Sequence, residues 1–107
     1  MTTTPDPVLE KFRTAITELY GARIERIVLY GSRARGDARP DSDYDIAVFL
    51  KDLASNRWDD IGCITEIELA IRDETDAQVH AMPYPAGHWR DPASPFMHEI
   101  RKDGLDL

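Results

Sequence analysis

The sequence lacks the features that mark several specialised classes of protein. It has 107 residues but a single cysteine, Cys63, which excludes an internal disulfide and a zinc site built from clustered cysteines. No apolar stretch approaches the length of a membrane span. The first residues, MTTTPDPVLEKF, lack the basic segment and the apolar run of a secretory signal. We therefore expect a cytoplasmic protein that does not associate with a membrane.

Basic residues are also in short supply. The chain carries 13 Lys and Arg against 20 Asp and Glu, which gives a formal net charge of −7. A general nucleic-acid binder needs a basic face, so we expect no direct binding of nucleic acid. The negative charge is compatible with a basic protein partner, although acidic surfaces usually serve only solubility.

What is present is the composition of an ordinary globular domain. Apolar residues make up 42% of the chain and charged residues 31%. A chain of this length can bury one hydrophobic core and has no room for a second. We therefore predict a single domain over residues 1–107.

Hydrophobic periodicity predicts the element order α-β-(short α)-β-α-β-α. Apolar residues at spacings of three and four predict helices over about 7–20, 58–73 and 95–103, and apolar runs or alternation predict strands over about 24–30, 44–50 and 75–82. Asp6 and Ser94 are suitable N-caps, and the proline-rich stretch 83–95 is typical of an exposed loop. We expect an α/β (α+β) fold, in which helices pack mainly on one face of a small mixed sheet of three or four strands.

The sequence pattern of the long helix at 58–73 predicts which of its side chains are buried. Trp58, Ile64 and Ile71 belong to an apolar stripe at helical spacing, which should face the core. Glu68 belongs to the charged residues between them, which should face solvent.

The segment GSRARGDARPDSDYD, from Gly31 to Asp45, joins the first two predicted strands. Asp43 and Asp45 are two apart, so on a strand their side chains project from the same face. Two like charges at close range disfavour each other's ionisation, and a divalent cation such as Mg²⁺, which prefers oxygen ligands, relieves that cost. Gly31 allows a sharp turn, and the N–H groups of a short helix after Ser32 would face an anion. The segment therefore predicts a phosphate site beside a metal site, as needed to handle a nucleoside triphosphate.

The motif Gly31-Ser32, ten residues, Asp43-Tyr44-Asp45 resembles the signature of the DNA polymerase β-like nucleotidyltransferase superfamily. It is particularly similar to the minimal nucleotidyltransferase (MNT) family, down to the sub-pattern GSRARG. The resemblance covers most of the chain from about residue 12, including the strand IAVFL and the terminal HEIRKDG. It implies a polymerase β-like nucleotidyltransferase fold, ATP as donor and a two-metal Mg²⁺ site.

The resemblance assigns metal-binding and catalytic roles to three carboxylates. Asp43 and Asp45 would supply oxygen ligands to the metal. A third carboxylate on a neighbouring strand would hold the second metal and orient or deprotonate the attacking hydroxyl. Asp76, predicted at the start of the third strand and on its polar face, is the candidate. His80 continues that face and is a candidate for contact with substrate, although its position favours a structural or surface role.

The nucleotide-binding candidates lie at the turn and in the residues that follow it. Gly31 and Ser32 would hold the triphosphate, Ser32 through its hydroxyl and its backbone N–H. Guanidinium groups match phosphate oxygens, so Arg33 is the first choice for a further phosphate contact and Arg35 the second.

The resemblance also implies a partner and a reaction. MNT proteins are commonly encoded beside a HEPN ribonuclease as a toxin–antitoxin system. The MNT antitoxin transfers AMP from ATP to a tyrosine hydroxyl of the toxin, an AMPylation that releases pyrophosphate. Two alternatives stay open: a non-catalytic antitoxin that neutralises the toxin by binding, and a nucleotidyltransferase acting on a small-molecule hydroxyl such as that of an aminoglycoside. The second alternative is weakened by the absence of an added acceptor-binding domain in this chain.

Overall fold

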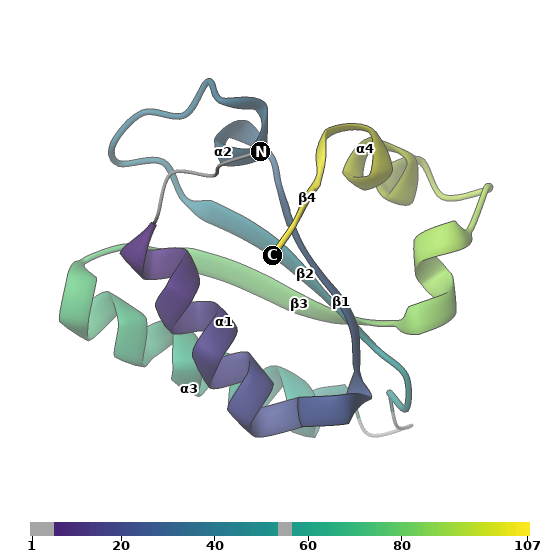
Figure 1. Cartoon of the computed structure of the whole chain (residues 1–107), viewed down its shortest axis with the longest axis horizontal. Helices are drawn as coiled ribbons and strands as arrows, with labels where there is room; N and C mark the ends of the chain where they lie inside the picture. Colours follow the sequence, from purple (N-terminus) through teal and green to yellow (C-terminus); the bar gives the residue numbers. More distant parts are fainter. Residues whose placement is uncertain (1–5, 54–56) are drawn as a thin grey trace.

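A computed structural model describes residues 6–53 and 57–107, without the side chain of Arg57. Within this part of the chain, four strands form one mixed sheet in the order β3-β2-β1-β4 (Figure 1). The strands are β1 (Ile24–Tyr30), β2 (Tyr44–Leu50), β3 (Val79–Pro85) and β4 (Leu105–Asp106). β1 pairs antiparallel with both β2 and β4, and β2 pairs parallel with β3. The expected mixed sheet is confirmed, with β4 as a short edge strand that the sequence pattern did not predict.

Helices connect the strands in the predicted order. The α-helices are α1 (Pro7–Tyr20), α2 (Ser32–Arg35), α3 (Arg57–Thr75) and α4 (Pro95–Asp103), and two 3₁₀ segments are η1 (Gly21–Arg23) and η2 (Ala86–Arg90). The predicted N-caps are confirmed, since Asp6 accepts a hydrogen bond from the backbone N–H of Val8 and Ser94 accepts one from Met97. No helix in the described part of the chain is long and apolar enough to cross a membrane.

One face of the sheet, the helix-covered face, packs against α1 and α3 (Figure 1). Alternate strand residues point to this face because side chains on a strand alternate sides. The buried strand residues of this core are Ile27, Leu29, Tyr44, Ile46, Val48, Leu50, Val79 and Ala81. They meet Phe12 and Ile16 of α1 and Ile64 and Ile71 of α3. The two long helices thus cover one face, as predicted.

The opposite side of the sheet, the second face, is covered only in part. Val28, Ala47 and Phe49 are buried there beneath Met97 and Ile100 of α4. Trp89 of η2 packs edge-on against the ring of Phe49, with ring centroids 5.4 Å apart. Two short elements therefore form a second, smaller core at one end of this face. The expectation of one core is wrong, because the sheet buries apolar residues on both of its faces.

The prediction that Trp58 packs in the core is wrong, because its side chain is 78% exposed. The Tyr20 hydroxyl at the end of α1 donates to a carboxylate oxygen of Asp60 at 3.1 Å. The end of α1 is therefore level with the start of α3, and Trp58 lies beyond the reach of the shorter helix. Burial in α3 falls on Ile64 and Ile71 instead.

The predicted bounds of the third strand are also wrong. α3 continues to Thr75, and Asp76 follows it with φ 63°, so β3 begins only at Val79. β3 then continues to Pro85 through residues that were predicted to form a loop. β3 is an edge strand, where a proline without an N–H is tolerated.

Candidate functional site

The turn after β1 is built around Gly31. Its φ of 77° is open to glycine at little cost, and a Cβ at this position would lie 2.6 Å from Oδ2 of Asp45. Tyr30 at the end of β1 pairs with Asp45 in the β1–β2 register. The glycine turn and the second aspartate of the motif are therefore in direct contact.

Asp43 and Asp45 lie at the start of β2, on the second face of the sheet. Tyr44 between them points to the helix-covered face. Burial raises the pKa of Asp45, and the charge of Asp43 adds to that rise, while His80 and Arg35 lower it. The fold thus holds a partly buried carboxylate next to a second one, at a free-energy cost that a bound cation would relieve.

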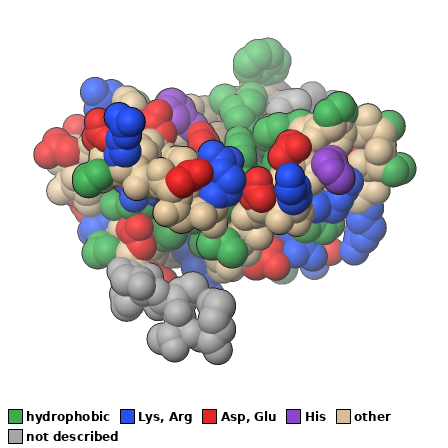
Figure 2. Space-filling model, turned by 90° about the horizontal axis from the view of Figure 1, so that it is seen from above, with side chains coloured by type: hydrophobic (Ala, Val, Ile, Leu, Met, Phe, Trp, Pro, Cys, Tyr) green, Lys and Arg blue, Asp and Glu red, His purple; other side chains and the backbone are tan. Residues whose placement is uncertain are grey.

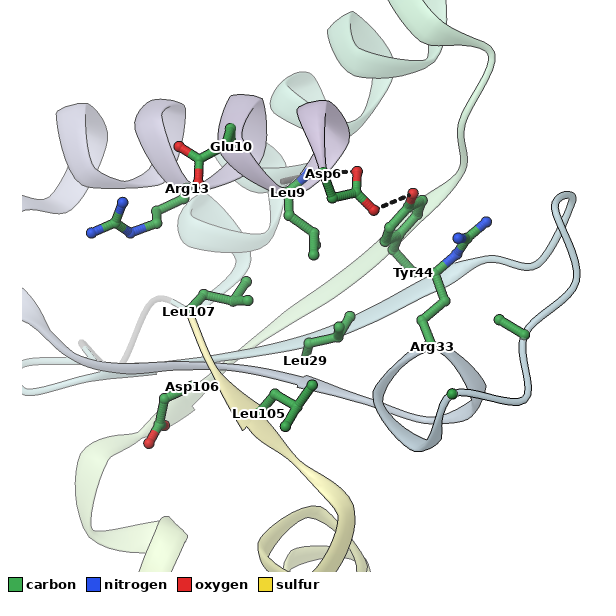
Figure 3. A pocket seen from close by; sticks show the side chains of 12 residues that line it. Asp6, Leu9, Glu10, Arg13, Leu29, Arg33, Tyr44, Leu105, Asp106 and Leu107 are labelled. Carbon is green, nitrogen blue, oxygen red and sulfur yellow. Dashed lines mark hydrogen bonds between the residues drawn. The ribbon is translucent and has the colours of Figure 1, made fainter. Parts of the chain in front are cut away.

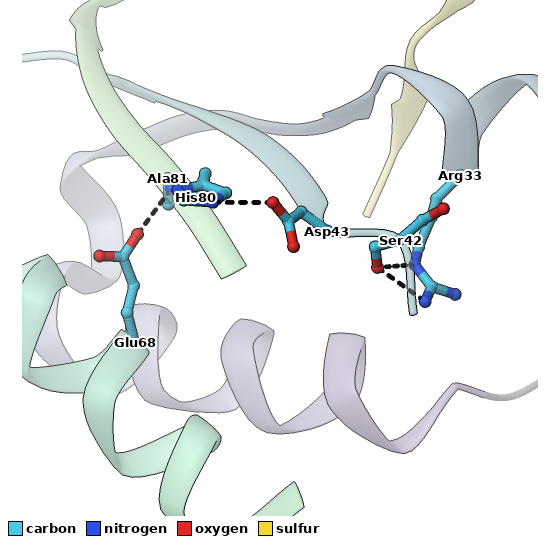
Figure 4. A network of polar contacts seen from close by, with 6 residues as sticks. All are labelled: Arg33, Ser42, Asp43, Glu68, His80 and Ala81. Carbon is cyan, nitrogen blue, oxygen red and sulfur yellow. Dashed lines mark hydrogen bonds and ion pairs between the residues drawn. The ribbon is translucent and has the colours of Figure 1, made fainter. Parts of the chain in front are cut away.

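Asp43 also has a partner on the neighbouring strand (Figure 4). Nε2 of His80 lies 3.0 Å from Oδ2 of Asp43. His80 is the residue of β3 that pairs with Asp45 in the parallel register. The imidazole therefore lies beside both carboxylates. The sequence alone predicts only a contact between His80 and substrate.

Glu68 reaches the same region from α3, and its predicted place on a solvated helix face is wrong. Its Oε2 accepts a hydrogen bond from the backbone N–H of Ala81 at 2.7 Å (Figure 4). Burial raises the pKa of Glu68, while the bond from Ala81 and the charge of His80 lower it. β3 is an edge strand with outward N–H groups, and Glu68 satisfies one of them next to His80.

Asp76 lies apart from the position predicted for it. It is not on the polar face of β3 but in the connection after α3, three residues before that strand. Its backbone N–H donates to the carbonyl of Arg72, which closes the last turn of the helix. Within residues 6–53 and 57–107, no group of three or more His, Cys, Asp or Glu side chains is arranged to hold a metal ion. The structure therefore does not bring Asp76 together with Asp43 and Asp45.

The two predicted phosphate-binding arginines have different surroundings. The Arg33 guanidinium donates to the carbonyls of Ser42, at 2.8 and 3.0 Å, and Pro40, at 3.1 Å, and it stacks on Tyr44. It therefore braces the α2–β2 loop on the side away from the aspartates. Arg35 is exposed, and its charge lowers the pKa of Asp45. The structure brings Arg35 nearer to the acidic pair than Arg33.

A cavity of about 490 Å³ lies on the helix-covered face, away from the acidic pair (Figure 3). It lies between the start of α1, β4 and the α2–β2 loop, and Leu9, Leu29 and Leu107 contribute apolar side chains to it. Asp6 caps α1 at its rim and accepts a hydrogen bond from the Tyr44 hydroxyl at 2.8 Å. Tyr44 thus separates this cavity from the carboxylates on the other face.

Aromatic rings lie beside the acidic pair on the second face. Tyr30 and Phe96 meet edge to face with centroids 5.4 Å apart, and Tyr84 lies 5.8 Å from Phe96. Burial, followed by the charges of Tyr84 and Asp45, raises the pKa of Tyr30 to about 12. The carboxylates therefore lie at the edge of an aromatic cluster.

Elsewhere on the surface, the view in Figure 2 shows acidic and basic side chains interspersed, with no single basic patch on that face.

The residues at this end of β2 fit one divalent cation. Mg²⁺ in nucleotide-handling sites is bound by one or two carboxylates, with water and substrate phosphate oxygens in the remaining positions. Asp43 and Asp45 supply such a pair. Burial of Asp45 next to a like charge makes its ionised form unfavourable, and a bound cation would offset that free-energy cost.

Comparisons with known proteins identify the family of the chain. The sequence family described as the nucleotidyltransferase domain matches residues 9–90. A candidate protein adenylyltransferase of Methanocaldococcus jannaschii is 30% identical over 46 residues, which cover 43% of this chain and 46% of that protein. The chain thus matches less than half the length of this curated relative.

Solved structures share the fold at lower identity. A toxin–antitoxin crystal structure with AMP-PNP has a TM-score of 0.60 at 21% identity, over 91% of this chain and 69% of that chain. A Shewanella oneidensis complex of a tri-AMPylated HEPN toxin with its MNT antitoxin has a TM-score of 0.50 at 19% identity, over 92% of this chain and 70% of that chain. At these identities the likeness establishes the fold alone. The family match extends over more than half of the sequence, and the chain therefore belongs to the nucleotidyltransferase domain family.

Proposed function

We propose that this chain is a Mg²⁺-dependent protein adenylyltransferase, which transfers AMP from ATP to a tyrosine hydroxyl of a HEPN ribonuclease and so acts as its antitoxin. The observation that carries the proposal is the contact between the Gly31 turn and the Asp43–Asp45 pair at the start of β2. That contact places a turn able to approach a polyphosphate beside carboxylates able to hold its cation.

The proposed reaction is a displacement at the α-phosphorus of ATP. The oxygen of the acceptor hydroxyl forms a bond to the α-phosphorus, and the bond from the α-phosphorus to the oxygen that bridges to the β-phosphorus breaks. Pyrophosphate leaves with that bridging oxygen, and the hydroxyl proton passes to a base. Mg²⁺, when bound, neutralises charge on the phosphate oxygens and aligns the attacking and leaving oxygens.

Each site residue has a proposed role in binding the cation or the nucleotide. Asp43 and Asp45 hold the cation, and Gly31 and Ser32 contact the triphosphate. Arg35 is exposed near Asp45, and its ion pair with Asp37 lies at the surface, where phosphate can replace Asp37. Arg33 is instead engaged with loop carbonyls. Asp76 stays a prediction as the third carboxylate and base.

The partner and acceptor are supported by the relatives. The curated relative carries the description of a protein adenylyltransferase, and one solved neighbour contains an AMPylated HEPN toxin bound to an MNT antitoxin. Another neighbour is a toxin–antitoxin complex with AMP-PNP, which supports ATP as the donor. We propose that the whole activity resides in the single domain of residues 1–107, with the acceptor on a separate protein.

The test is incubation of the chain with labelled ATP, Mg²⁺ and the HEPN ribonuclease proposed as its partner, sought first in the neighbouring gene. We expect label on a tyrosine of the HEPN protein, release of pyrophosphate, and loss of ribonuclease activity. The double variant Asp43→Asn, Asp45→Asn should still form the complex but should neither label nor neutralise the ribonuclease.

Two results would redirect the proposal. A tight complex that neutralises the ribonuclease without labelling, and equally well with the double variant, would make the protein a binding antitoxin. Transfer of label to hydroxyl-bearing antibiotics in a panel, and not to the HEPN protein, would make it an enzyme of small molecules.

A further inference from the structure

We propose that the groove between α1 and α3 is a docking surface for a basic amphipathic helix of the partner ribonuclease. The identity of the partner rests on the proposed function. The groove adds a contact surface on the side of the sheet opposite the acidic pair.

Two cavities adjoin along the outer surface of the two long helices, which lie side by side in Figure 1. Their volumes are about 400 Å³ and about 420 Å³. The residues that line both are Ala15, Glu18, Ile67 and Ala70. Because they share these residues, the two cavities form one hollow, the α1–α3 groove. Glu10 lines one end of it and Leu19 the other, so the groove extends about 13 Å along α1.

The floor of the α1–α3 groove is apolar. Ala15 of α1 and Ala70 of α3 end at methyl groups, which leaves the space between the helices open. Ile67 and Cys63 of α3 are partly buried in the floor, and Leu19 at one end is 42% exposed. An apolar groove of this kind accepts an amphipathic helix, whose apolar residues at spacings of three and four lie against the floor.

The rim of the α1–α3 groove is acidic on both sides. Its carboxylates are Glu10 and Glu18 of α1 and Glu66 and Glu74 of α3. Among the described residues that line the groove, only Lys11 is basic. Nζ of Lys11 lies 2.7 Å from Oε2 of Glu74, but both side chains are exposed, so water screens the pair and a cation of the partner can replace Lys11. The groove therefore complements a helix that carries Lys or Arg on both sides of its apolar stripe.

Charge also decides between two possible occupants. A ribonuclease binds the phosphate backbone of RNA through Lys and Arg, so the proposed partner should carry a basic surface. A second copy of this chain has a formal net charge of −7 and the same acidic rim, so two grooves would repel each other. The charges therefore favour the ribonuclease over a second copy.

The α1–α3 groove and the acidic pair lie on opposite sides of the sheet. α1 and α3 pack against the helix-covered face, whereas Asp43 and Asp45 project from the second face. A helix in the groove leaves the acidic pair open, and the ribonuclease reaches that pair with another segment. Changes in the groove should therefore alter the affinity for the ribonuclease and leave nucleotide binding unchanged.

The first experiment uses Cys63, which is the only cysteine of the chain and lines the groove. Mass spectrometry follows the alkylation of Cys63 in the full chain by a maleimide, with and without the HEPN ribonuclease. With the ribonuclease at about ten times its dissociation constant, alkylation should be about tenfold slower, because about a tenth of the chain remains free. The matched control is Cys63→Ala with Leu69→Cys, since Leu69 is 56% exposed on α3 and does not line the groove. The ribonuclease should leave its alkylation rate unchanged.

The second experiment reverses one charge on each side of the groove, with Glu18→Lys and Glu66→Lys in one variant. Its affinity for the ribonuclease should fall about tenfold or more, because Lys or Arg of the docked helix then meets a like charge. The KM for the ribonuclease should rise accordingly, while kcat and AMP-PNP binding stay at the wild-type values. The matched control is Glu25→Lys with Asp52→Lys, which makes the same charge change at two exposed positions outside the groove. Its affinity should stay close to that of the wild type.

The outcomes separate the groove from the proposed function. A complex that transfers AMP while Cys63 reacts at its free rate, or that both charge-reversal variants weaken equally, would overturn the groove and leave the proposed function standing. Protection of Cys63 that rises with the concentration of this chain alone would make the groove a contact between two copies and overturn the inference. Protection of Cys63 by the ribonuclease without AMP transfer would support the groove and overturn the enzyme. Absence of both a complex and AMP transfer would overturn both.

Discussion

The two faces of the sheet use alternate residues of one strand for different purposes. On the helix-covered face, Ile46 and Val48 of β2 are fully buried beneath α1 and α3. On the second face, Ala47 and Phe49 are equally buried beneath α4 and η2, but Asp45 lies beyond that cover and is partly exposed. The difference lies in the cover that the helices provide, since the strand itself is continuous.

This comparison explains how the site is held in place without a core of its own. A slip of one residue in the pairing of β2 would send its apolar residues to the second face and Asp45 into the core. Burial of Ile46 and Val48 therefore fixes the register that presents Asp43 and Asp45 outward. Stability resides mainly on one face, and the proposed chemistry occupies the open end of the other.

The largest expected effect is that of Asp45→Asn on AMP transfer. Loss of the carboxylate should lower AMP transfer to the HEPN protein by about 10³-fold, because the cation that would neutralise charge on the reacting phosphate loses one of its two protein ligands. The fold should remain intact and slightly more stable, since burial raises the pKa of Asp45 and so makes its charged form costly. Initial rates and chemical denaturation at pH 7 measure the two effects. A destabilised Asp45→Asn would contradict the division.

The matched change on the other face is Ile46→Ala, one residue along β2. Ile46 is fully buried, so the lost contacts and the cavity left behind should cost about 3 kcal/mol in the free energy of unfolding. At a temperature where the variant is still folded, its transfer rate should stay within a few-fold of the wild type. Urea denaturation and the transfer assay provide the values. An inactive but fully stable variant would show that the faces are not separable in this way.

Much of this arrangement could be predicted from the sequence because its causes are local. The bounds of β1 and β2 follow from apolar runs, and the caps Asp6 and Ser94 follow from residue type alone. The side shared by Asp43 and Asp45 follows from the period of a strand. Each of these inferences needs only a few neighbouring residues.

The errors concern residues whose position depends on distant parts of the chain. Trp58 belongs to a helical stripe, but it is exposed because α1 ends level with the following turn of α3. Asp76 lies outside the strand predicted for it, because α3 continues beyond its predicted end. The position of His80 beside Asp45 follows from the parallel pairing of β3 with β2, and no sequence spacing links the two residues.

A smaller effect is expected at the turn that joins the two regions. Gly31→Ala should cost about 2 kcal/mol of stability through its backbone conformation. It should also displace the Asp45 carboxylate, whose Oδ2 would lie 2.6 Å from the new methyl group. Gly36→Ala is the matched control, because Gly36 also has a positive φ of 85° but a methyl group added there would have nothing within 4 Å. Both variants should lose stability, but only Gly31→Ala should lose Mg²⁺ binding and transfer. Equal loss of binding in both would mean that strain alone disturbs the site.

The smallest expected effect concerns Glu68, which links α3 on the helix-covered face to the edge strand that carries His80. Because burial raises its pKa, the folded protein holds the Glu68 proton to a higher pH than the unfolded chain does. The free energy of unfolding therefore falls as the pH rises from about 4 through the raised pKa. Glu68→Gln keeps an oxygen acceptor for the Ala81 N–H and removes this dependence.

The stability of Glu68→Gln relative to the wild type should therefore rise with pH over that interval and then stay constant. Denaturation curves between pH 4 and pH 8 measure this difference, and Glu66→Gln, on the exposed side of α3, should show no comparable trend. A Glu68→Gln variant that becomes less stable than the wild type as the pH rises would show that the charged bond to Ala81 outweighs the cost of burying the carboxylate. The edge strand would then depend on that charge for its position, and the separation between the stabilising face and the site would be weaker than the burial pattern suggests.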